Sequence, residues 1–345
     1  MKKFIALILA FVCIFIVPVS ANAVSLDSGI EDLREEFVYG IGPLRNNISI
    51  DYRYFSPVKE NDDTKYPLVI WLHGLSDGQY EGKQIEKSEI AYWASDEFQS
   101  RFAPAGGAFI MAARSREELN ICWTNETIEP LRAAIDNFIA KNADNIDLSR
   151  IYIGGYSMGG KMTLKMAIAY PEMFAAAFPI CPAWSPDEAA LSHIKDMPVW
   201  ITSSSRDPLV SYNLGVTPTW MKLSEITNIP EDCRLSTLTK VCYADGTKTG
   251  SSHHAWFAVN YDLFTTENGP YHNMTTKNAL GEEVILTYPD GMISWLTSHT
   301  SDYDGTVIEG MGNITNDMST DNMSAKLTIV EFFKIIFNAI ISLFR

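Results

Sequence analysis

Cysteine is scarce in this chain, with five in 345 residues, and no two are spaced as Cys-x-x-Cys. That spacing argues against a zinc site built from cysteine pairs. Cys13 lies in an apolar N-terminal stretch, so four cysteines remain for the rest of the chain, and this even number allows disulfides if the chain is exported. Cys233 and Cys242 would pair if the segment between them folded back on itself, and free buried thiols are the alternative. The other two are Cys122 and Cys181.

Positive charge is also in short supply. Lysine and arginine total 27 against 42 acidic residues, which gives a formal net charge of −15, and there is no basic run. A field of this sign repels phosphate backbones, so nucleic acid is not expected as a partner. The hydrophobic fraction of 46% is ordinary for a globular protein, and no internal repeat is visible.

The two ends of the chain differ in character from its middle. Residues 1–23 combine Lys2 and Lys3, an apolar stretch and a final Ala-Asn-Ala, which predicts a secretory signal peptide and an extracellular location. Residues 24–299 form the expected main folded domain, which carries the motifs described below, and residues 300–326 are a polar linker. Residues 327–345 predict an amphipathic helix that binds a membrane surface or a protein partner, with docking on its own domain as the alternative.

Apolar segments alternate with helical patterns between these ends. Residues 67–72 form a continuous apolar run, typical of a strand covered on both faces. Residues 36–39 and 48–55 alternate at period two, as in an antiparallel pair at a sheet edge. Residues 127–141 place their apolar side chains on one helical face. This order predicts an α/β fold with a mostly parallel central sheet, helices on both faces and an antiparallel N-terminal edge. Further strands are expected at 107–112, 151–153, 176–180 and 198–202.

Residues 155–159 read Gly-Tyr-Ser-Met-Gly and lie between an expected strand and an expected helix. Strand, Gly-x-Ser-x-Gly, helix is the nucleophile elbow of an α/β-hydrolase, in which the serine hydroxyl stands exposed at a sharp turn. A glycine-rich loop without chemistry is the structural alternative. We therefore predict that Ser157 is a nucleophile and that the amide of Met158 faces a developing oxyanion.

Two loops after expected strands carry further candidates. Beyond the strand at 67–72, the amide of Leu75 is the candidate for the second oxyanion donor, and His73 is expected to brace this loop. Beyond the strand at 198–202 comes Asp207. A buried carboxylate there would orient a catalytic imidazole and stabilise its protonated form, although an Asp-Pro turn is a structural alternative.

The catalytic histidine belongs in the loop after the last strand, and two adjacent histidines lie there. His253 and His254 follow a strand-like segment, 235–243, and a Gly-Ser-Ser turn. The chain order serine, acid, histidine is that of the α/β-hydrolases. The residue pattern does not choose between the two, so His254 stands as the alternative base.

As a set, these motifs resemble the secreted esterase and peptidase branch of the α/β-hydrolase superfamily, which includes feruloyl-esterase-like and polyhydroxybutyrate-depolymerase-like enzymes. The resemblance covers roughly residues 35–298. In that branch the catalytic histidine lies three residues before a tryptophan, which here implies His253, ahead of Trp256. The matching segments are 71–74, 155–160, 174–181, 198–201 with 206–208, and 253–256.

Two departures from that branch concern the choice of substrate more than the mechanism. Ser203 and Ser204 stand where relatives usually have a His-Gly-like pair, and the loop after residue 74 lacks their Glu-Arg-Gly pattern. Trp123 and Trp184 lie near expected strand ends and could offer a platform to a sugar ring or an aromatic acyl group, although core packing is the commoner role of tryptophan.

The sequence thus leads to the hypothesis of a secreted serine hydrolase that cleaves carboxylic esters. Its triad would be Ser157, His253 and Asp207, with no metal and no organic cofactor. The resemblance implies acyl or feruloyl esters on polysaccharide as substrates. A serine peptidase of the same fold and a non-catalytic surface binding protein are the alternatives.

Overall fold

The computed structural model describes residues 29–59, 62–86, 90–116, 123–242, 249–266, 269–271 and 273–306. The expected signal peptide, the expected C-terminal helix and most of the expected linker lie outside the described residues. Among the helices within these ranges, none has the length and apolar content needed to cross a bilayer.

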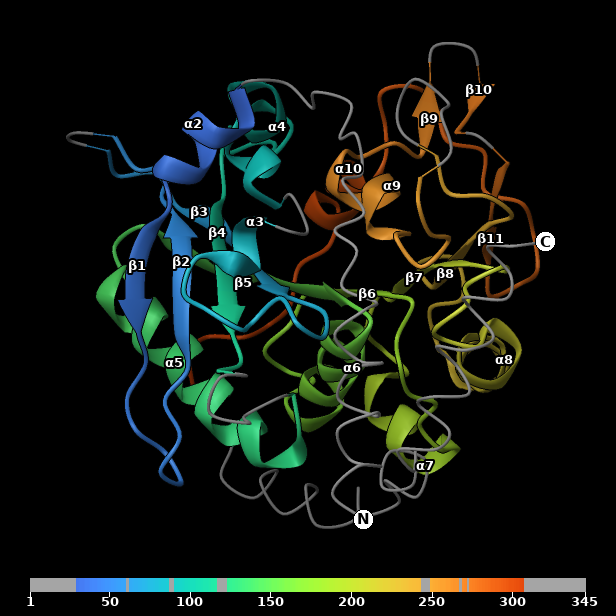
Figure 1. Ribbon diagram of the computed structural model, residues 1–345, viewed down its shortest axis with the longest axis horizontal. Helices are drawn as coiled ribbons and strands as arrows, with labels where there is room; N and C mark the ends of the chain where they lie inside the picture. The colour runs from blue at the N-terminus through green and yellow to red at the C-terminus, as the bar shows by residue number, and fades with distance from the viewer. Residues whose placement is uncertain are drawn as a thin grey trace, which may run out of the picture.

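Within the described residues, nine strands form one sheet in the order β1-β2-β4-β3-β5-β6-β7-β8-β11 (Figure 1). The neighbours from β4 through β8 pair in parallel. The strands β1 and β2 pair antiparallel at one edge, and β11 does so at the other. The predicted fold class, with its antiparallel N-terminal edge, is confirmed; the second antiparallel edge was not expected. The strands are β1 (Val38–Ile41), β2 (Asp51–Phe55), β3 (Tyr66–Leu72), β4 (Phe109–Arg114), β5 (Ile146–Tyr156), β6 (Ala176–Ile180), β7 (Trp200–Ser204), β8 (Arg234–Leu238) and β11 (Met274–Asn278).

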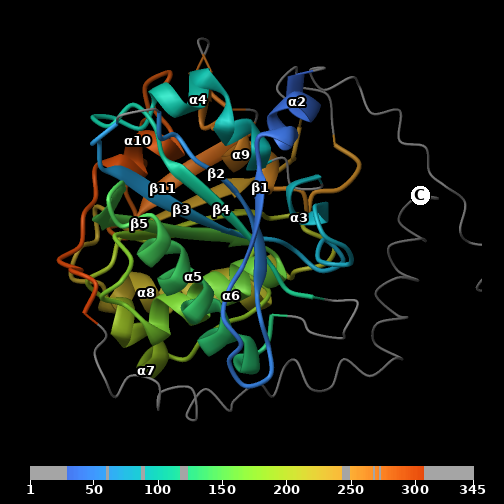
Figure 2. The same ribbon diagram turned by 90° about the vertical axis from the view of Figure 1, so that its left-hand side faces the viewer.

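Helices cover both faces of the sheet (Figures 1 and 2). One face carries α5 (Ile128–Lys141), α6 (Met158–Ala169), α7 (Glu188–Leu191) and α8 (Thr217–Ile226). The other carries α2 (Gly29–Glu35), α4 (Asp96–Ser100), α9 (Trp256–Asn260) and α10 (Met292–Thr297). The remaining short elements are α3 (Lys83–Glu86), η1 (Ile90–Ala94), η3 (Asn125–Thr127), η4 (Ser192–Ile194), η5 (Tyr212–Val216), β9 (Thr265–Thr266) and β10 (Gly269–Pro270).

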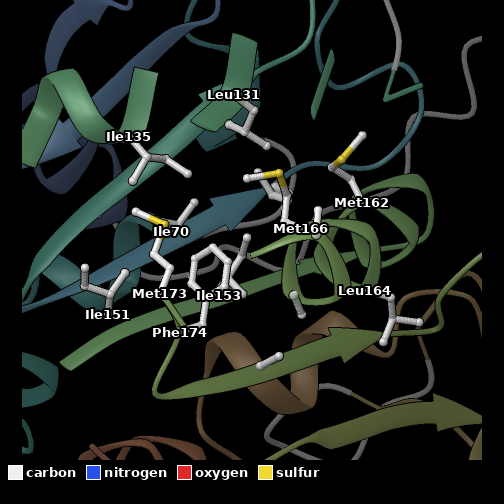
Figure 3. Close-up of a cluster of buried hydrophobic side chains, with 14 of the residues drawn as sticks. Ile70, Leu131, Ile135, Ile151, Ile153, Met162, Leu164, Met166, Met173 and Phe174 are labelled. Atoms are coloured by element: carbon white, nitrogen blue, oxygen red, sulfur yellow. The ribbon is translucent and has the colours of Figure 1, made fainter. Parts of the chain in front are cut away.

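Strand β3 shows how the sequence builds two cores. All seven of its residues are buried, and alternate side chains go to opposite faces. Leu68 and Ile70 join the core under α5 and α6, whereas Val69 and Trp71 join the core under α9 and α10. Figure 3 shows Ile70 in the first of these cores, with side chains from α5 and α6 around it. Each fully buried aliphatic side chain contributes about 1.5–3 kcal/mol to the free energy of unfolding. Because both faces of the strand are packed in this way, the sheet is a stable base for the loops at its strand ends.

The cysteines are free thiols where the structure describes them. Cys181, Cys233 and Cys242 are buried and unpaired, and Cys122 lies outside the described residues. Cys233 precedes β8 and Cys242 follows it. The five extended residues of this strand therefore lie between the two cysteines. The Cys233–Cys242 disulfide is not formed, and the alternative of free buried thiols holds for the described cysteines.

Candidate active site

Ser157 forms the turn between β5, which ends at Tyr156, and α6, which begins at Met158. Its φ of 57° and ψ of −114° are a combination that non-glycine residues rarely adopt. The Ser157 amide donates to the Ile180 carbonyl at 2.9 Å, and the Ala183 amide donates to the Ser157 carbonyl at 3.1 Å. Backbone strain of this kind, about 1–3 kcal/mol, persists where the surroundings over-determine it and is common at active sites. The strand–turn–helix context of an elbow is thus present.

The glycines beside Ser157 allow a close approach to β3. A Cβ atom on Gly155 or Gly159 would collide with the carbonyl oxygen of Leu72, the last residue of β3. Only glycine leaves room for α6 to start so near that strand. The elbow is therefore held directly against the loop that follows β3.

Asp207 and His253 come together beyond the strand ends. Asp207 lies three residues after the end of β7, and His253 lies in the loop before α9. Nδ1 of His253 is 2.7 Å from Oδ2 of Asp207, and the two side chains are 9% and 0% exposed. A buried hydrogen bond to a carboxylate is among the stronger ones in proteins. It fixes the imidazole with its other nitrogen, Nε2, available as a proton acceptor.

The end of β6 connects the elbow to the histidine. Ile180 accepts the Ser157 amide, and the next residue, Cys181, places its thiol 3.6 Å from the His253 carbonyl oxygen. The ring of Tyr156 lies 6.1 Å from the His253 ring, measured between centroids. Ser157 and His253 therefore both form a hydrogen bond with the same short, buried segment, Ile180 and Cys181.

The surroundings distinguish the two adjacent histidines. Burial lowers the pKa of His253, but the neighbouring Cys181 and the Asp207 carboxylate outweigh burial and raise this pKa above its ordinary value. The pKa of His254 is lowered, by burial and by the charge of His253. The acid is thus paired with His253, and the His254 ring lies against Trp256 instead.

Buried side chains hold the loop after β3, which contains Leu75. Nδ1–H of His73 donates to the Gly74 carbonyl at 2.6 Å, and Nε2 of His73 accepts the Ser115 amide at 3.0 Å. The indole N–H of Trp123 donates to the His73 carbonyl at 2.9 Å. His73 therefore braces the loop, as the sequence predicts, while Leu75 is exposed.

The far end of this loop is fixed as well. The Tyr156 hydroxyl donates to the Asp77 carboxylate. Arg114 donates to the Gly78 carbonyl at 3.2 Å and forms a buried ion pair with Asp51 at 2.7 Å. An amide on a loop fixed in this way can be held in place for an oxyanion before the reaction starts.

His73 makes stability depend on pH. Burial, with Arg114 nearby, lowers the pKa of His73 from 6.5 to about 4. The unfolded chain therefore binds the extra proton first, and stability is lost as pH falls from 6.5 towards 4. By linkage the loss at pH 4 is about 3 kcal/mol. In urea unfolding between pH 7 and pH 4, His73→Gln should flatten this dependence, whereas replacing the exposed His193 in the same way should leave it unchanged. Equal slopes for both variants would contradict the assignment.

The two tryptophans have different positions. Trp123 is fully buried, and its ring lies 5.1 Å from that of His73. The expectation that Trp123 forms a substrate platform is therefore wrong, because its contacts with the loop leave no face exposed. Trp184 is half-buried, and its ring lies 4.9 Å from the ammonium group of Lys165.

Cys181 is the site residue that the sequence did not single out as functional. Its thiol, a carboxylate oxygen of Asp207 and a ring nitrogen of His253 lie within 4.8 Å of one another. The only signal was its position directly after β6, at the edge of the sheet where the other candidates lie.

Comparison with known proteins identifies the family to which the chain belongs. Residues 47–284 match the model of the family described as "Putative esterase". A thermostable esterase of known structure is 26% identical, with a TM-score of 0.57 over 78% of this chain. The match covers 64% of that enzyme, slightly less than two thirds of its length. No curated protein sequence matches the chain.

Other solved structures are more distant. Est1E from Butyrivibrio proteoclasticus is 18% identical, with a TM-score of 0.45 over 65% of this chain and 94% of Est1E. The acylaminoacyl peptidase of Pyrococcus horikoshii is 17% identical, with a TM-score of 0.48 over 69% of this chain and 43% of the peptidase. The family match spans most of the described sheet and the elbow, acid and histidine loops. The chain belongs to this esterase family and has the α/β-hydrolase fold.

Proposed function

We propose that this protein is a serine hydrolase that cleaves carboxylic esters through a covalent acyl-enzyme. The observation that carries the proposal is the 2.7 Å hydrogen bond between Asp207 and His253, beside the strained turn at Ser157. Membership of an esterase family supports the reaction class.

In this mechanism Ser157 Oγ bonds to the carbonyl carbon of the ester while its proton passes to Nε2 of His253. The amides of Leu75 and Met158 donate to the oxyanion. The bond to the alcohol then breaks, and His253 returns the proton to the leaving oxygen. Water repeats the sequence on the acyl-enzyme, which releases the carboxylic acid and restores Ser157. Asp207 keeps the imidazole oriented, and the mechanism uses no metal or organic cofactor.

Active-site labelling tests this assignment. A fluorophosphonate should modify one residue, Ser157, and should abolish hydrolysis of a short activated ester in step with the labelling. Peptide mapping by mass spectrometry identifies the labelled serine. Labelling elsewhere, or full hydrolysis after stoichiometric labelling of Ser157, would overturn the mechanism, and a protein that neither reacts nor hydrolyses would be a binding protein.

We further propose acyl or feruloyl esters on polysaccharide as the substrates. The acidic composition, the signal-peptide pattern and the half-buried Trp184 support an extracellular polymer substrate. Aryl esters, feruloylated and acetylated xylan, and peptide amides should be compared side by side. Cleavage of the amides but not the esters would identify a serine peptidase instead.

The histidine assignment gives a separate prediction. His253→Ala should lower kcat by about 10³-fold or more, because it removes the proton acceptor. His254→Ala should keep substantial activity, since the His254 ring lies near Trp256 and the Asp207 carboxylate is hydrogen-bonded to His253. Steady-state kinetics on one activated ester compare the two directly. The reverse pattern would transfer the role of base to His254.

Residues 1–23 and 327–345 lead to a proposal about location. We propose that the chain is exported and that its C-terminal segment attaches the enzyme to the outer face of the membrane or to a protein partner. An apolar sector as wide as that of 327–345 is unfavourable in water. Truncation after Ser324 should give an active enzyme that no longer co-sediments with vesicles. Unfolding on truncation would show that the segment belongs to the core.

A further inference from the structure

Cys181 occupies a constrained position that the hydrolytic mechanism does not use. It follows β6, is fully buried and has a φ of 35°, in the region that favours glycine. Its amide donates to the Thr202 carbonyl at 2.8 Å, and its thiol donates to the His253 carbonyl at 3.6 Å. The conformation is thus fixed by the neighbouring strand, and the thiol lies at the acid–histidine pair.

Three kinds of metal ligand converge there from separate loops. The Cys181 thiol, a carboxylate oxygen of Asp207 and a ring nitrogen of His253 all lie within 4.8 Å of one another. A tetrahedral zinc ion, with bonds of about 2.0–2.3 Å, places its ligand atoms roughly 3.3–3.6 Å apart. Small side-chain shifts, including a wider separation of Nδ1 and Oδ2, would therefore complete three ligand bonds.

The other described thiols lie in different surroundings. Cys233 donates to the Met197 carbonyl at 3.7 Å and lies 3.3 Å from the Thr227 hydroxyl. In the part of the chain that the structure describes, Cys181, Asp207 and His253 are the one group of three or more histidine, cysteine or acidic side chains close enough to hold an ion together.

We propose that Cys181, Asp207 and His253 form an inhibitory binding site for one thiophilic divalent ion, of the class of Zn²⁺ and Cd²⁺. Thiolate and imidazole ligands select such ions over Mg²⁺ and Ca²⁺, which prefer oxygen. Cys181 loses its thiol proton to solvent and binds through sulfur. The proton on Nδ1 of His253 moves to Nε2, and the lone pair left on Nδ1 binds the ion, with one carboxylate oxygen of Asp207 as the third ligand.

The inhibitory role, though not the binding itself, rests on the hydrolytic mechanism proposed above, which this binding mode stops for a defined reason. Once the ion occupies Nδ1, the remaining proton of the neutral imidazole is on Nε2, so this nitrogen no longer accepts a proton from Ser157. The side chains of the site are at most 9% exposed, so the ion enters only when the loops open briefly. Inhibition should therefore develop slowly and should reverse when a chelator removes the ion.

Direct binding of Cd²⁺ tests the site without relying on ester hydrolysis. In the Ser157→Ala protein, titration with Cd²⁺ should produce the ultraviolet cadmium–thiolate absorption, with one ion bound per chain in equilibrium dialysis. Mg²⁺ should not compete. The active enzyme should lose activity in proportion to this occupancy, measured after preincubation.

Matched cysteine variants locate the site. Cys181→Ala should raise the Cd²⁺ concentration for half-inhibition at least ~100-fold. Mutating a group that is only hydrogen-bonded to a metal ligand lowers metal affinity ~10–100-fold, and removing a ligand itself should lower it more. Each variant is normalised to its own metal-free rate. Cys233→Ala, which removes another buried thiol, should bind and respond as the parent protein does.

Three results would overturn the proposal. They are unchanged Cd²⁺ sensitivity in folded Cys181→Ala, loss of sensitivity in Cys233→Ala, and absence of the thiolate absorption in the parent protein. If Cys181→Ala does not fold, the anomalous signal of cadmium in crystals of the unmodified enzyme decides. A peak bonded to Cys181 and His253 supports the site, and its absence at saturating Cd²⁺ rejects it.

Discussion

Replacing Ser157 with alanine should lower kcat on a short activated ester by about 10³-fold or more, because the members of a triad act as a unit. Alanine keeps the Cβ atom and the backbone hydrogen bonds to Ile180 and Ala183, so the turn should persist and only the hydroxyl is lost. Steady-state kinetics on one activated ester measure this loss of kcat. The unfolding midpoint should stay close to that of the parent protein.

A neighbouring serine gives the control for this experiment. Ser252 directly precedes His253. Like Ser157→Ala, Ser252→Ala removes one serine hydroxyl, here in the loop that contains His253. It should keep most of the activity. Near-full activity in Ser157→Ala would remove the serine mechanism, whereas an equal loss in both variants would point to a disturbed loop rather than a missing nucleophile.

The parts of the site that could be predicted from sequence are those with local signals. The elbow is one continuous stretch, Gly155 to Gly159, and its glycines are required where α6 passes the Leu72 carbonyl. Asp207 follows the strand expected at 198–202, whose apolar residues predict that it is buried. In a parallel sheet, side chains just beyond the strand ends collect at one edge, so the approximate meeting place followed from the order of elements.

What could not be predicted depends on contacts between distant segments. The residues around Trp123 in the sequence do not indicate that its indole N–H donates to the His73 carbonyl or that Trp123 is buried. The thiol of Cys181 reaches His253 across 72 positions of sequence. Strand β11, Met274–Asn278, is polar and was missed, because its structure comes from pairing with β8 rather than from an apolar pattern of its own.

Asp207→Asn should lower kcat by about 10⁴-fold, the scale expected when a triad histidine is held in the wrong tautomer. The two oxygens of Asp207 have different partners: Oδ1 accepts the amides of Leu209 and Val210 at 2.8 and 2.9 Å, and Oδ2 faces Nδ1 of His253. The two amides would keep the single oxygen of asparagine at the Oδ1 position. Its NH₂ group would then donate to Nδ1, leaving the imidazole proton on Nε2, where it blocks proton uptake from Ser157.

This prediction separates orientation of the histidine from stability of the turn. Since asparagine still accepts the two amides, the unfolding midpoint of Asp207→Asn should change little. Asp187 is the matched control, because its carboxylate caps α7 by accepting the Ala190 amide at 2.8 Å and is exposed. Asparagine caps helices as well as aspartate, so Asp187→Asn should retain both stability and activity. The expected result is a ~10⁴-fold loss of kcat. If Asp207→Asn instead kept more than about a tenth of the parent kcat, the role of Asp207 would be limited to stabilising the turn. The orientation of His253 would then depend on its remaining backbone contacts, with the Cys181 thiol and the Ser251 hydroxyl.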